Sequence, residues 1–425
     1  MIAAFMALTM ALTICLYAAA VISIRPSPDD YTTPKEPLGC RRHGLEEGES
    51  NLSNELNEVH VSSKGKFIQV QSLWIYPIKS CRGIEVEEAE IVATGLKYDR
   101  QYCFAQLHSP FPLSNSDSQQ IASAHQWRPI TQREFPLLSQ VRVELWLPHS
   151  DDPHYHRYLP YVLSGGALVV HFPYQEDGLL AGLKALPSRL FPQLVSKPCK
   201  TFLIPYDPTL QGRAGRYPHE PLKIWKDTPI SLNMGIHLPP ELKFYLGVRN
   251  PLTLFRVDQP RSIFRCAPPA STLGYQPITG FADAYPINIL SLASLQSLSA
   301  LQPPGSPPLS FRRFRGNIAL TDTTPFQEET WTQIQIGRHV FSVCCRCVRC
   351  GVPNIDPHTG VKHGSEPYKT LVGKRNVDEG SPKLGCLGMQ LVPELNPDNS
   401  GGHGWIRVWD VVSIWEEGEH RYIEM

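Results

Sequence analysis

Short runs in which apolar and polar residues alternate recur along this chain, and they constrain its fold more than any other feature. In residues 137–147 the apolar positions that stand against polar neighbours are Leu138, Val141, Val143 and Leu145. Such alternation indicates a strand with one buried face. Further strand-like runs are residues 67–75, 83–92, 101–105, 167–172, 318–320, 331–336, 339–343 and 406–415. The forty prolines favour loops and short strands over a helical bundle, so we expect a β-rich α+β fold.

Two segments have a helical pattern instead. The first is residues 240–247. In the second, residues 291–301, Ser291 is suited to cap the helix, and leucines recur on one face at Leu292, Leu295, Leu298 and Leu301. We expect the second helix to be the better defined.

The first 66 residues differ in composition from the rest. Residues 1–24 carry no charge and are long enough to cross a membrane as a helix, which needs about 20 residues. Basic residues follow this run from Arg25 onward and none precedes it, which favours a single-pass membrane anchor with a cytosolic body. A secretory signal cleaved near residues 18–20 is the alternative. Residues 25–66 are polar and aperiodic, and we expect a flexible linker there.

Cysteines are concentrated in one place. Four of the eleven lie within seven positions, namely Cys344, Cys345, Cys347 and Cys350. Because a thiolate is a soft ligand, this cluster indicates metal or sulfur chemistry rather than a secreted disulfide scaffold. The turn signal at residues 356–360 puts the thiols near the end of a strand. Forty basic and forty acidic residues cancel, so no nucleic-acid partner is indicated.

Several other runs stand in a specific order with these cysteines. They are residues 73–83 with a Lys-Ser pair, 95–100, 131–133, 283–294, 314–318, 347–360 with a Cys-x-Arg-Cys run, 366–371 and 406–412. Together they resemble the MOSC family, the molybdenum cofactor sulfurase C-terminal family, with its N-terminal β-barrel partner domain. Within that family the runs resemble the mitochondrial amidoxime-reducing component. The resemblance implies a β-barrel-like domain at residues 67–255, packed on a bent β-barrel MOSC domain at 256–420, with the cofactor in the cleft between them.

The resemblance also implies a set of site residues. In that family the second cysteine of the Cys-x-Arg-Cys run binds molybdenum, which here gives Cys350 the metal-binding and catalytic role. The pterin cofactor and its phosphate would be lined by Lys79, Ser80, Arg100, Arg315, Asn317, Val348 and Arg349. These residue types suit that chemistry, because Lys and Arg offset phosphate charge and soft sulfur suits molybdenum. The alternatives are a solvated charge for Lys79 and Arg100, and a buried polar network for Arg315 and Asn317.

The function that the resemblance implies is a membrane-anchored molybdenum oxidoreductase, placed at the mitochondrial outer membrane. It would reduce small N-hydroxylated substrates such as amidoximes, with electrons from cytochrome b5 and its reductase. Ala284, Tyr285 and Gln390 depart from the reductase pattern, so the substrate itself is left open. No transaminase-like domain is recognisable, so pyridoxal phosphate is attached to this chain only as a family label.

Two other functions remain open at this stage. A non-catalytic module could hold a structural zinc with Cys345, Cys347, Cys350 and either Cys386 or His358. A sulfur carrier could instead bind the cofactor and hold a persulfide on Cys350.

Overall fold

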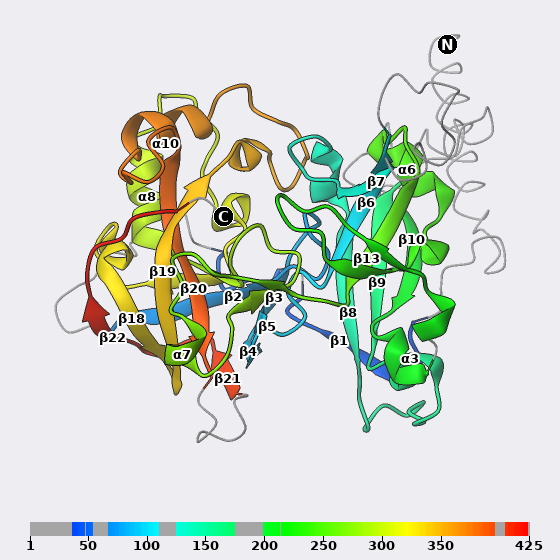
Figure 1. The fold of residues 1–425 in the computed structure, drawn as a ribbon. Coiled ribbons are helices and arrows are strands. Elements are labelled where there is room, and N and C mark those ends of the chain that lie inside the picture. The colour runs from blue at the N-terminus through cyan, green and yellow to red at the C-terminus, as the bar shows by residue number, and fades with distance from the viewer. Residues whose placement is uncertain are drawn as a thin grey trace, which may run out of the picture. The chain divides into compact units, whose positions relative to one another are not determined.

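The computed structural model of this protein describes residues 36–46, 48–53, 67–109, 125–174, 199–212, 214–395 and 404–423. All helices and strands in the described ranges belong to one compact unit, Pro37–Met425. The fold class is β-rich α+β with curled sheets, as the sequence predicted (Figure 1).

The largest sheet has eight strands and forms the left side of the view in Figure 1. Its neighbours pair antiparallel, except for β16 and β17, which are parallel. In spatial order the strands are β22 (Val412–Glu417), β18 (Trp331–Ile336), β19 (His339–Arg349), β20 (Gly385–Glu394), β16 (Ile287–Ser291), β17 (Ile318–Thr321), β2 (Gln69–Ile75) and β3 (Ile84–Val86).

Smaller sheets make up the rest. One has the order β11 (His219–Pro221), β12 (Ile230–Asn233), β13 (Leu252–Val257), β6 (Tyr102–His108) and β7 (Gln126–Pro129). Another has the order β1 (Cys40–His43), β8 (Arg142–Pro148), β9 (Ala167–Pro173) and β10 (Cys199–Pro205). A three-stranded sheet has the order β21 (Gly404–Arg407), β4 (Glu88–Val92) and β5 (Gly95–Leu96). A two-stranded sheet consists of β14 (Arg261–Ser262) and β15 (Ile278–Thr279).

The described helices are short. The α-helices are α3 (Pro160–Leu163), α6 (Pro240–Leu246), α7 (Ala270–Leu273), α8 (Leu292–Ala300), α9 (Phe311–Phe314) and α10 (Tyr368–Lys374). The 3-10 turns are η1 (Pro136–Gln140), η2 (Pro208–Gln211), η3 (Ala214–Arg216), η4 (Gly235–His237), η5 (Gln327–Thr330) and η6 (Val352–Asn354).

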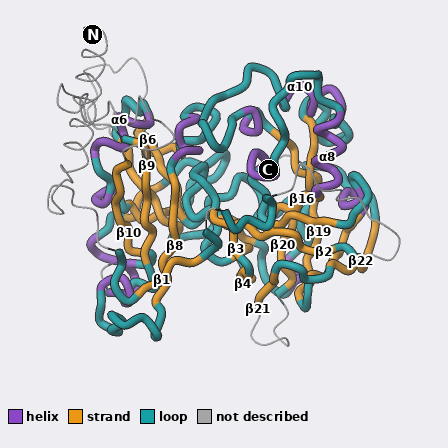
Figure 2. Tube along the Cα trace, turned by 180° about the vertical axis from the view of Figure 1, so that it is seen from behind, coloured by secondary structure: helices purple, strands orange, loops and turns teal. Residues whose placement is uncertain are grey.

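Helix α8 confirms three of the four leucines of the expected pattern, whereas Leu301 caps the C-terminal end and is exposed. The Ser291 hydroxyl accepts a hydrogen bond from the Ser294 amide at 3.2 Å, which caps the first turn. Leu292, Leu295 and Leu298 are buried in one cluster that also contains Leu371 of α10. Both helices therefore pack on the same side of the eight-stranded sheet, as Figure 2 shows from behind.

The eight-stranded sheet joins distant parts of the sequence. β2 pairs antiparallel with β17, with Leu73 opposite Ile318. The domain bounds 67–255 and 256–420 stay a prediction, but a cut between residues 255 and 256 would not separate the sheets. Pairing depends on which edge is free and on matching buried faces, and sequence position does not restrict it.

The structure corrects several local expectations. The run 406–415, expected as one strand, forms β21 and β22, and the run 83–92 forms β3 and β4. Cys40–His43, inside the expected flexible linker, form β1 and pair with Pro148 to Leu145 of β8. Residues 136–140 form the 3-10 turn η1, so the strand expected over 137–147 begins only at Arg142. Pro136 has a fixed φ and no N–H, which suits the first position of a turn.

The expected membrane anchor is also corrected. No helix in the described part of the chain is long and apolar enough to cross a membrane. The longest α-helix described, α8, has nine residues, about 14 Å at 1.5 Å per residue, against a hydrocarbon core of about 30 Å. The prediction of a single-pass anchor with a cytosolic body at the mitochondrial outer membrane therefore has no support among the described helices. The segment it relied on, residues 1–24, lies outside the described residues.

Candidate functional site

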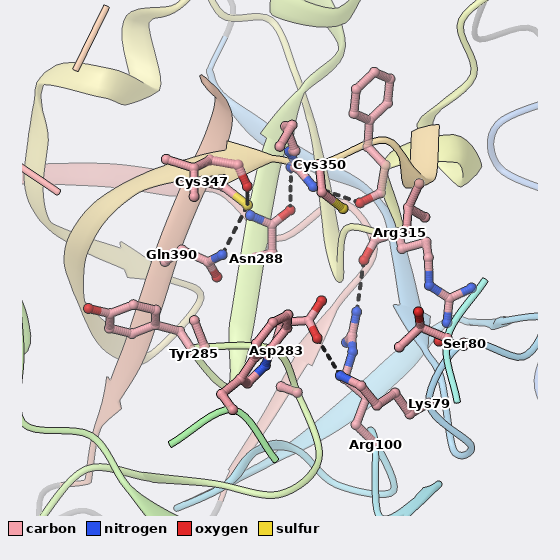
Figure 3. Close-up of a pocket in the computed structure, with 18 of the residues that line it drawn as sticks. Lys79, Ser80, Arg100, Asp283, Tyr285, Asn288, Arg315, Cys347, Cys350 and Gln390 are labelled. Atoms are coloured by element: carbon pink, nitrogen blue, oxygen red, sulfur yellow. Dashed lines mark hydrogen bonds and ion pairs between the residues drawn. The ribbon is translucent and has the colours of Figure 1, made fainter. Parts of the chain in front are cut away.

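A cleft of about 720 Å³ brings together every site residue predicted from the sequence. Its lining includes Lys79, Ser80, Arg100, Arg315, Asn317, Val348, Arg349 and Cys350. Figure 3 shows most of them, with Cys347 and Cys350 on the upper side of the view and Lys79 and Asp283 on the lower side. Residues about 270 positions apart in the sequence thus share one cavity.

The cleft is strongly basic. Among the described residues that line it, nine are Lys or Arg and two are Asp. The basic residues are Lys79, Arg100, Arg133, Lys226, Arg261, Arg265, Arg313, Arg315 and Arg349, and the acids are Asp227 and Asp283. Because the whole chain has equal numbers of basic and acidic residues, this local surplus favours an anionic ligand.

Left-handed backbone at three positions aims side chains into the cleft. Ser80 has φ 67°, Arg100 has φ 48° and Arg315 has φ 53°. For residues with a β-carbon this region costs energy, so the surrounding structure must hold it. Part of that support is backbone pairing: the Lys79 amide donates to the Tyr102 carbonyl at 2.7 Å, and the Arg100 amide donates to the Tyr76 carbonyl at 2.8 Å.

Lys79 forms an ion pair at the wall of the cleft. Its ammonium donates to Asp283 Oδ1 at 2.5 Å and to the Phe281 carbonyl at 2.8 Å. Burial lowers the pKa of Lys79 despite this partner. Lost hydration raises the pKa of Asp283, but the charge and hydrogen bond of Lys79 outweigh it and lower that pKa to about 2. Asp283 is therefore ionised at neutral pH.

Arg100 and Arg315 form what we call the stacked pair, because both guanidiniums lie on the ring of buried Tyr76. Their Cζ atoms are 4.7 and 4.3 Å from the ring centroid. Arg100 also donates to Asp99 Oδ2 at 2.5 Å and to the Arg315 carbonyl at 2.9 Å. Arg315 donates from Nη1 to the Cys81 carbonyl at 2.7 Å.

The Nη2 nitrogen of Arg315 stands apart from this pattern. It is buried and has no hydrogen-bond partner in the described structure. Burial lowers the pKa of Arg315. A buried guanidinium nitrogen without an acceptor is costly, so a ligand that supplies an acceptor would be favoured here.

Asn317 fits the buried polar network that was its alternative. Its side chain donates to the Trp74 carbonyl at 3.1 Å and accepts from the Asn288 amide at 3.1 Å. Its Oδ1 also accepts from Arg100 at 3.2 Å. Asn317 thus holds Arg100 in place and still lines the cleft.

Arg349 is a brace between strands. Its three guanidinium nitrogens donate to the Leu387 carbonyl at 2.8 Å, the Phe314 carbonyl at 2.8 Å and Asn288 Oδ1 at 3.0 Å. It is 8% exposed. The brace fixes the end of β19, the strand that leads into Cys350, and Val348 lies beside it opposite Cys386 of β20.

Cys350 directly follows β19 and is partly exposed to the cleft. Cys347 is buried, and its sulfur accepts a hydrogen bond from Gln390 Nε2 at 3.0 Å. Burial raises the pKa of the Cys347 thiol, although nearby Arg349 opposes this. Of these two thiols, Cys350 is therefore the one better placed to meet a ligand.

Several lining residues were not assigned from the sequence. Asp283 and Asn288 lay inside a resembling run, which was the available signal. No sequence signal pointed to Arg261 or Arg313. Each is buried, and its guanidinium donates to carbonyl oxygens and to one Asp. Trp225, whose ring lies 5.1 Å from Arg133 Cζ, also had no such signal.

The cysteines do not form a metal-binding cluster by themselves. Within the described ranges, no group of three or more His, Cys, Asp or Glu side chains is placed to hold a metal ion. The zinc alternative required such a group from Cys345, Cys347 and Cys350 with Cys386 or His358, all of which are described. A metal that needs one protein thiolate and takes its other ligands from a cofactor is compatible with the same geometry.

Comparison with known proteins gives the site a family. Residues 67–156 match the MOSC N-terminal beta barrel domain and residues 277–413 match the MOSC domain. The chain is 26% identical over 357 residues to mitochondrial amidoxime-reducing component 1 of Mus musculus, covering 81% of this chain and 82% of that protein. It is 25% identical over 324 residues to mitochondrial amidoxime reducing component 2 of Bos taurus, covering 74% of each. A molybdenum cofactor sulfurase of Oryza sativa subsp. japonica is 24% identical over 336 residues, which cover 76% of this chain and 33% of that protein.

Proposed function

We propose that this chain, which belongs to the MOSC domain family, binds a molybdenum cofactor in the basic cleft and works as an oxidoreductase on small N-hydroxylated substrates. The electrons would come from cytochrome b5 and its reductase. Relatives named amidoxime-reducing components, similar over about three quarters of this chain, support the reaction class.

One observation carries the proposal. Eight residues chosen from sequence runs far apart line a single cleft, and its charge surplus and the unpartnered Arg315 Nη2 suit an anionic cofactor. The cofactor's pterin tail bears a phosphate, and bidentate Arg contacts are the preferred protein partners of that group.

Each residue has a role that follows from its contacts. Cys350 would give its thiolate to the metal. The stacked pair would hold the phosphate, with Arg315 Nη2 gaining an acceptor. Asp283 already pairs with Lys79 and Asp99 with Arg100, so the uncompensated positive charge offered to the ligand comes mainly from Arg315. Arg349 would position Cys350 without touching the ligand through its side chain.

The bound cofactor would supply the site that accepts the substrate oxygen and passes two electrons. In the overall reaction an N–OH group, two electrons and two protons give N–H and one water. Because its pKa is about 2, Asp283 is ionised near neutral pH and is not a proton donor in this reaction.

Metal and pterin analysis of the purified full-length chain tests the proposal directly. We expect about one molybdenum and one pterin per chain, and reduction of a model amidoxime with cytochrome b5 and its reductase. Zinc in place of molybdenum, or cyanide-labile sulfur without metal, would reject it in favour of the zinc module or the persulfide carrier.

Cys350→Ala should abolish amidoxime reduction while the protein still folds and keeps some pterin, because the phosphate contacts lie elsewhere in the cleft. The matched control Cys344→Ala removes a thiol that does not line the cleft and should leave turnover largely intact. Near-normal activity of Cys350→Ala would exclude Cys350 as the essential metal ligand.

A further inference from the structure

A second group of thiols lies behind the wall of the cleft. Cys344 and Cys345 are consecutive, yet both are buried in one apolar cluster with Tyr285 and Val392. Side chains alternate between the two faces of a regular strand. Here the pairing of β19 with β20 shifts between Val343 and Cys345, and a bulge of this kind can turn neighbouring side chains to one side.

Cys266 packs against this cluster from a different segment and is partly exposed. Its thiol donates to the Arg421 carbonyl at 3.6 Å, and the Cys345 thiol is the group that affects its pKa most. The backbone of Cys266 is left-handed, with φ 54°, which costs energy and is often found at functional positions. The position thus combines access to solvent with packing against a cluster that holds two buried thiols.

The two sulfurs differ in character. The hydrogen bond from Cys345 lowers the pKa of Cys266 to about 6, against the opposing effect of burial. The pKa of Cys345 is raised well above its ordinary value by that same bond and by burial. Cys266 is thus a reactive thiolate near neutral pH, next to a protonated thiol.

We propose that Cys266 is a peroxide-reactive site and that Cys345 resolves its oxidised form as an intramolecular disulfide. The Cys266 thiol and one peroxide, H₂O₂, give a sulfenic acid and one water. The Cys345 thiol then attacks the sulfenic sulfur, the S–S bond forms, the S–O bond breaks and a second water leaves. In sum, two thiols are oxidised to one disulfide and the peroxide is reduced to two waters.

The Cys266–Cys345 disulfide would affect the cleft because both cysteines belong to segments that contribute lining residues. Phe264 and Arg265 line the cleft and directly precede Cys266. Cys345 lies on β19, the strand that ends at the brace Arg349. A Cys266–Cys345 disulfide would tie the lining segment to that strand. This inference does not depend on which reaction the cleft performs.

Peptide mapping of the full-length protein tests the bond. Trypsin would release residues 266–312 with one cysteine and residues 339–346 with Cys344 and Cys345. After brief treatment with one equivalent of H₂O₂, we expect these peptides to be linked, with the loss of two hydrogens. Absence of that link, or a Cys344–Cys345 bond within the second peptide, would overturn the proposal.

Two variants assign the resolving thiol. Cys345→Ser should remove the link and leave a sulfenic acid on Cys266 that dimedone labels, whereas Cys344→Ser should keep the link. The reverse pattern would overturn the assignment.

Alkylation of the wild-type protein needs no variant. Cys199 is an exposed thiol whose pKa is raised by partial burial. At pH 6, iodoacetamide should modify Cys266 about tenfold faster than Cys199, once the lower nucleophilicity of the more acidic thiolate is included. Equal rates, or faster labelling of Cys199, would contradict a reactive Cys266.

Discussion

Two regions of the cleft wall hold their arginines in different ways. In the stacked pair, Arg100 and Arg315 lie on the Tyr76 ring, and Arg315 keeps one buried nitrogen without an acceptor. At the end of β19, Arg349 uses all three guanidinium nitrogens on two carbonyls and Asn288. The stacked pair has hydrogen-bonding capacity left for a ligand, and Arg349 has much less.

This difference in hydrogen bonding assigns different roles to arginines that the same sequence motifs predicted: the stacked pair would bind the ligand, and Arg349 would position Cys350. All three arginines were predicted to line the cofactor, and all three line the cleft. A buried guanidinium that is already satisfied gains little from a further anion, whereas one with an open donor gains a charge-assisted bond. Mutation of the stacked pair should therefore impair ligand binding, and mutation of Arg349 should impair stability.

Replacing Arg349 should have the largest effect on stability. Arg349→Ala would leave the Leu387 and Phe314 carbonyls and Asn288 without their donor. We expect a loss of about 3–5 kcal/mol in the free energy of unfolding, measured by urea denaturation. Arg349→Lys should not restore it, because one ammonium cannot reach three divergent acceptors.

The control for that experiment is Arg407→Ala. Arg407 pairs with Glu88 at the surface, where its side chain is 61% exposed, and its loss should cost less than about 1 kcal/mol. If Arg349→Ala were as mild as this control, the brace interpretation would be wrong.

Replacing Arg315 should show the opposite pattern. Arg315→Met removes one bond to the Cys81 carbonyl together with an unsatisfied buried nitrogen, so stability should fall by only about 1 kcal/mol. Loss of a charge-assisted contact should weaken retention of the anionic cofactor about tenfold or more. Pterin content per chain, measured beside the urea midpoint, checks both parts. Full pterin content combined with a large loss of stability would make Arg315 a second brace.

The smallest effect concerns Asp283 and pH. The pKa of Asp283 falls from an ordinary value near 3.8 to about 2 in the folded protein, so its ionised form stabilises the fold above about pH 4. That contribution is lost as the pH falls through about 2. Its side chain is 66% exposed, so after solvent screening we expect about 1 kcal/mol.

Urea denaturation of Asp283→Asn and the wild type measures this contribution. The difference in unfolding free energy should be constant from pH 5 to 7 and shrink from pH 4 downward. A difference that grew on acidification would contradict the ion pair with Lys79.

The sequence predicted which residues line the site better than it predicted the hydrogen bonds that hold those residues in place. The runs around Lys79, Arg315 and Cys350 carried enough pattern to name residues that share one cleft. The roles of Arg349 and Asn317 within it depend on which carbonyls and amides lie nearby, which only the folded chain determines. Asp283 could have been suspected from its run, but Arg261 looks like any other surface arginine until burial is known.

Local patterns predicted elements well where packing agrees with them. The leucine spacing gave α8, and alternation gave most strands. Predictions were wrong where a single residue or a distant pairing partner determines the local structure. Pro136 starts the 3-10 turn η1 where a strand was expected. Pairing with β8 makes residues 40–43 a strand within a polar stretch. Neither effect has a periodic signal in the sequence.

The pairing of β2 with β17 has a consequence for how the chain is made. Leu73 leaves the ribosome about 245 residues before Ile318, its partner. At 5–20 residues per second, synthesis of that interval takes roughly 12–50 s. Six of the seven residues of β2 are buried in the finished fold, so for that time the nascent chain carries a strand that can pair with β3 but whose other partner, β17, does not yet exist. The first part of the protein to be translated therefore completes its sheet only when the last third is being made, and it must be protected until then from pairing with any other open strand.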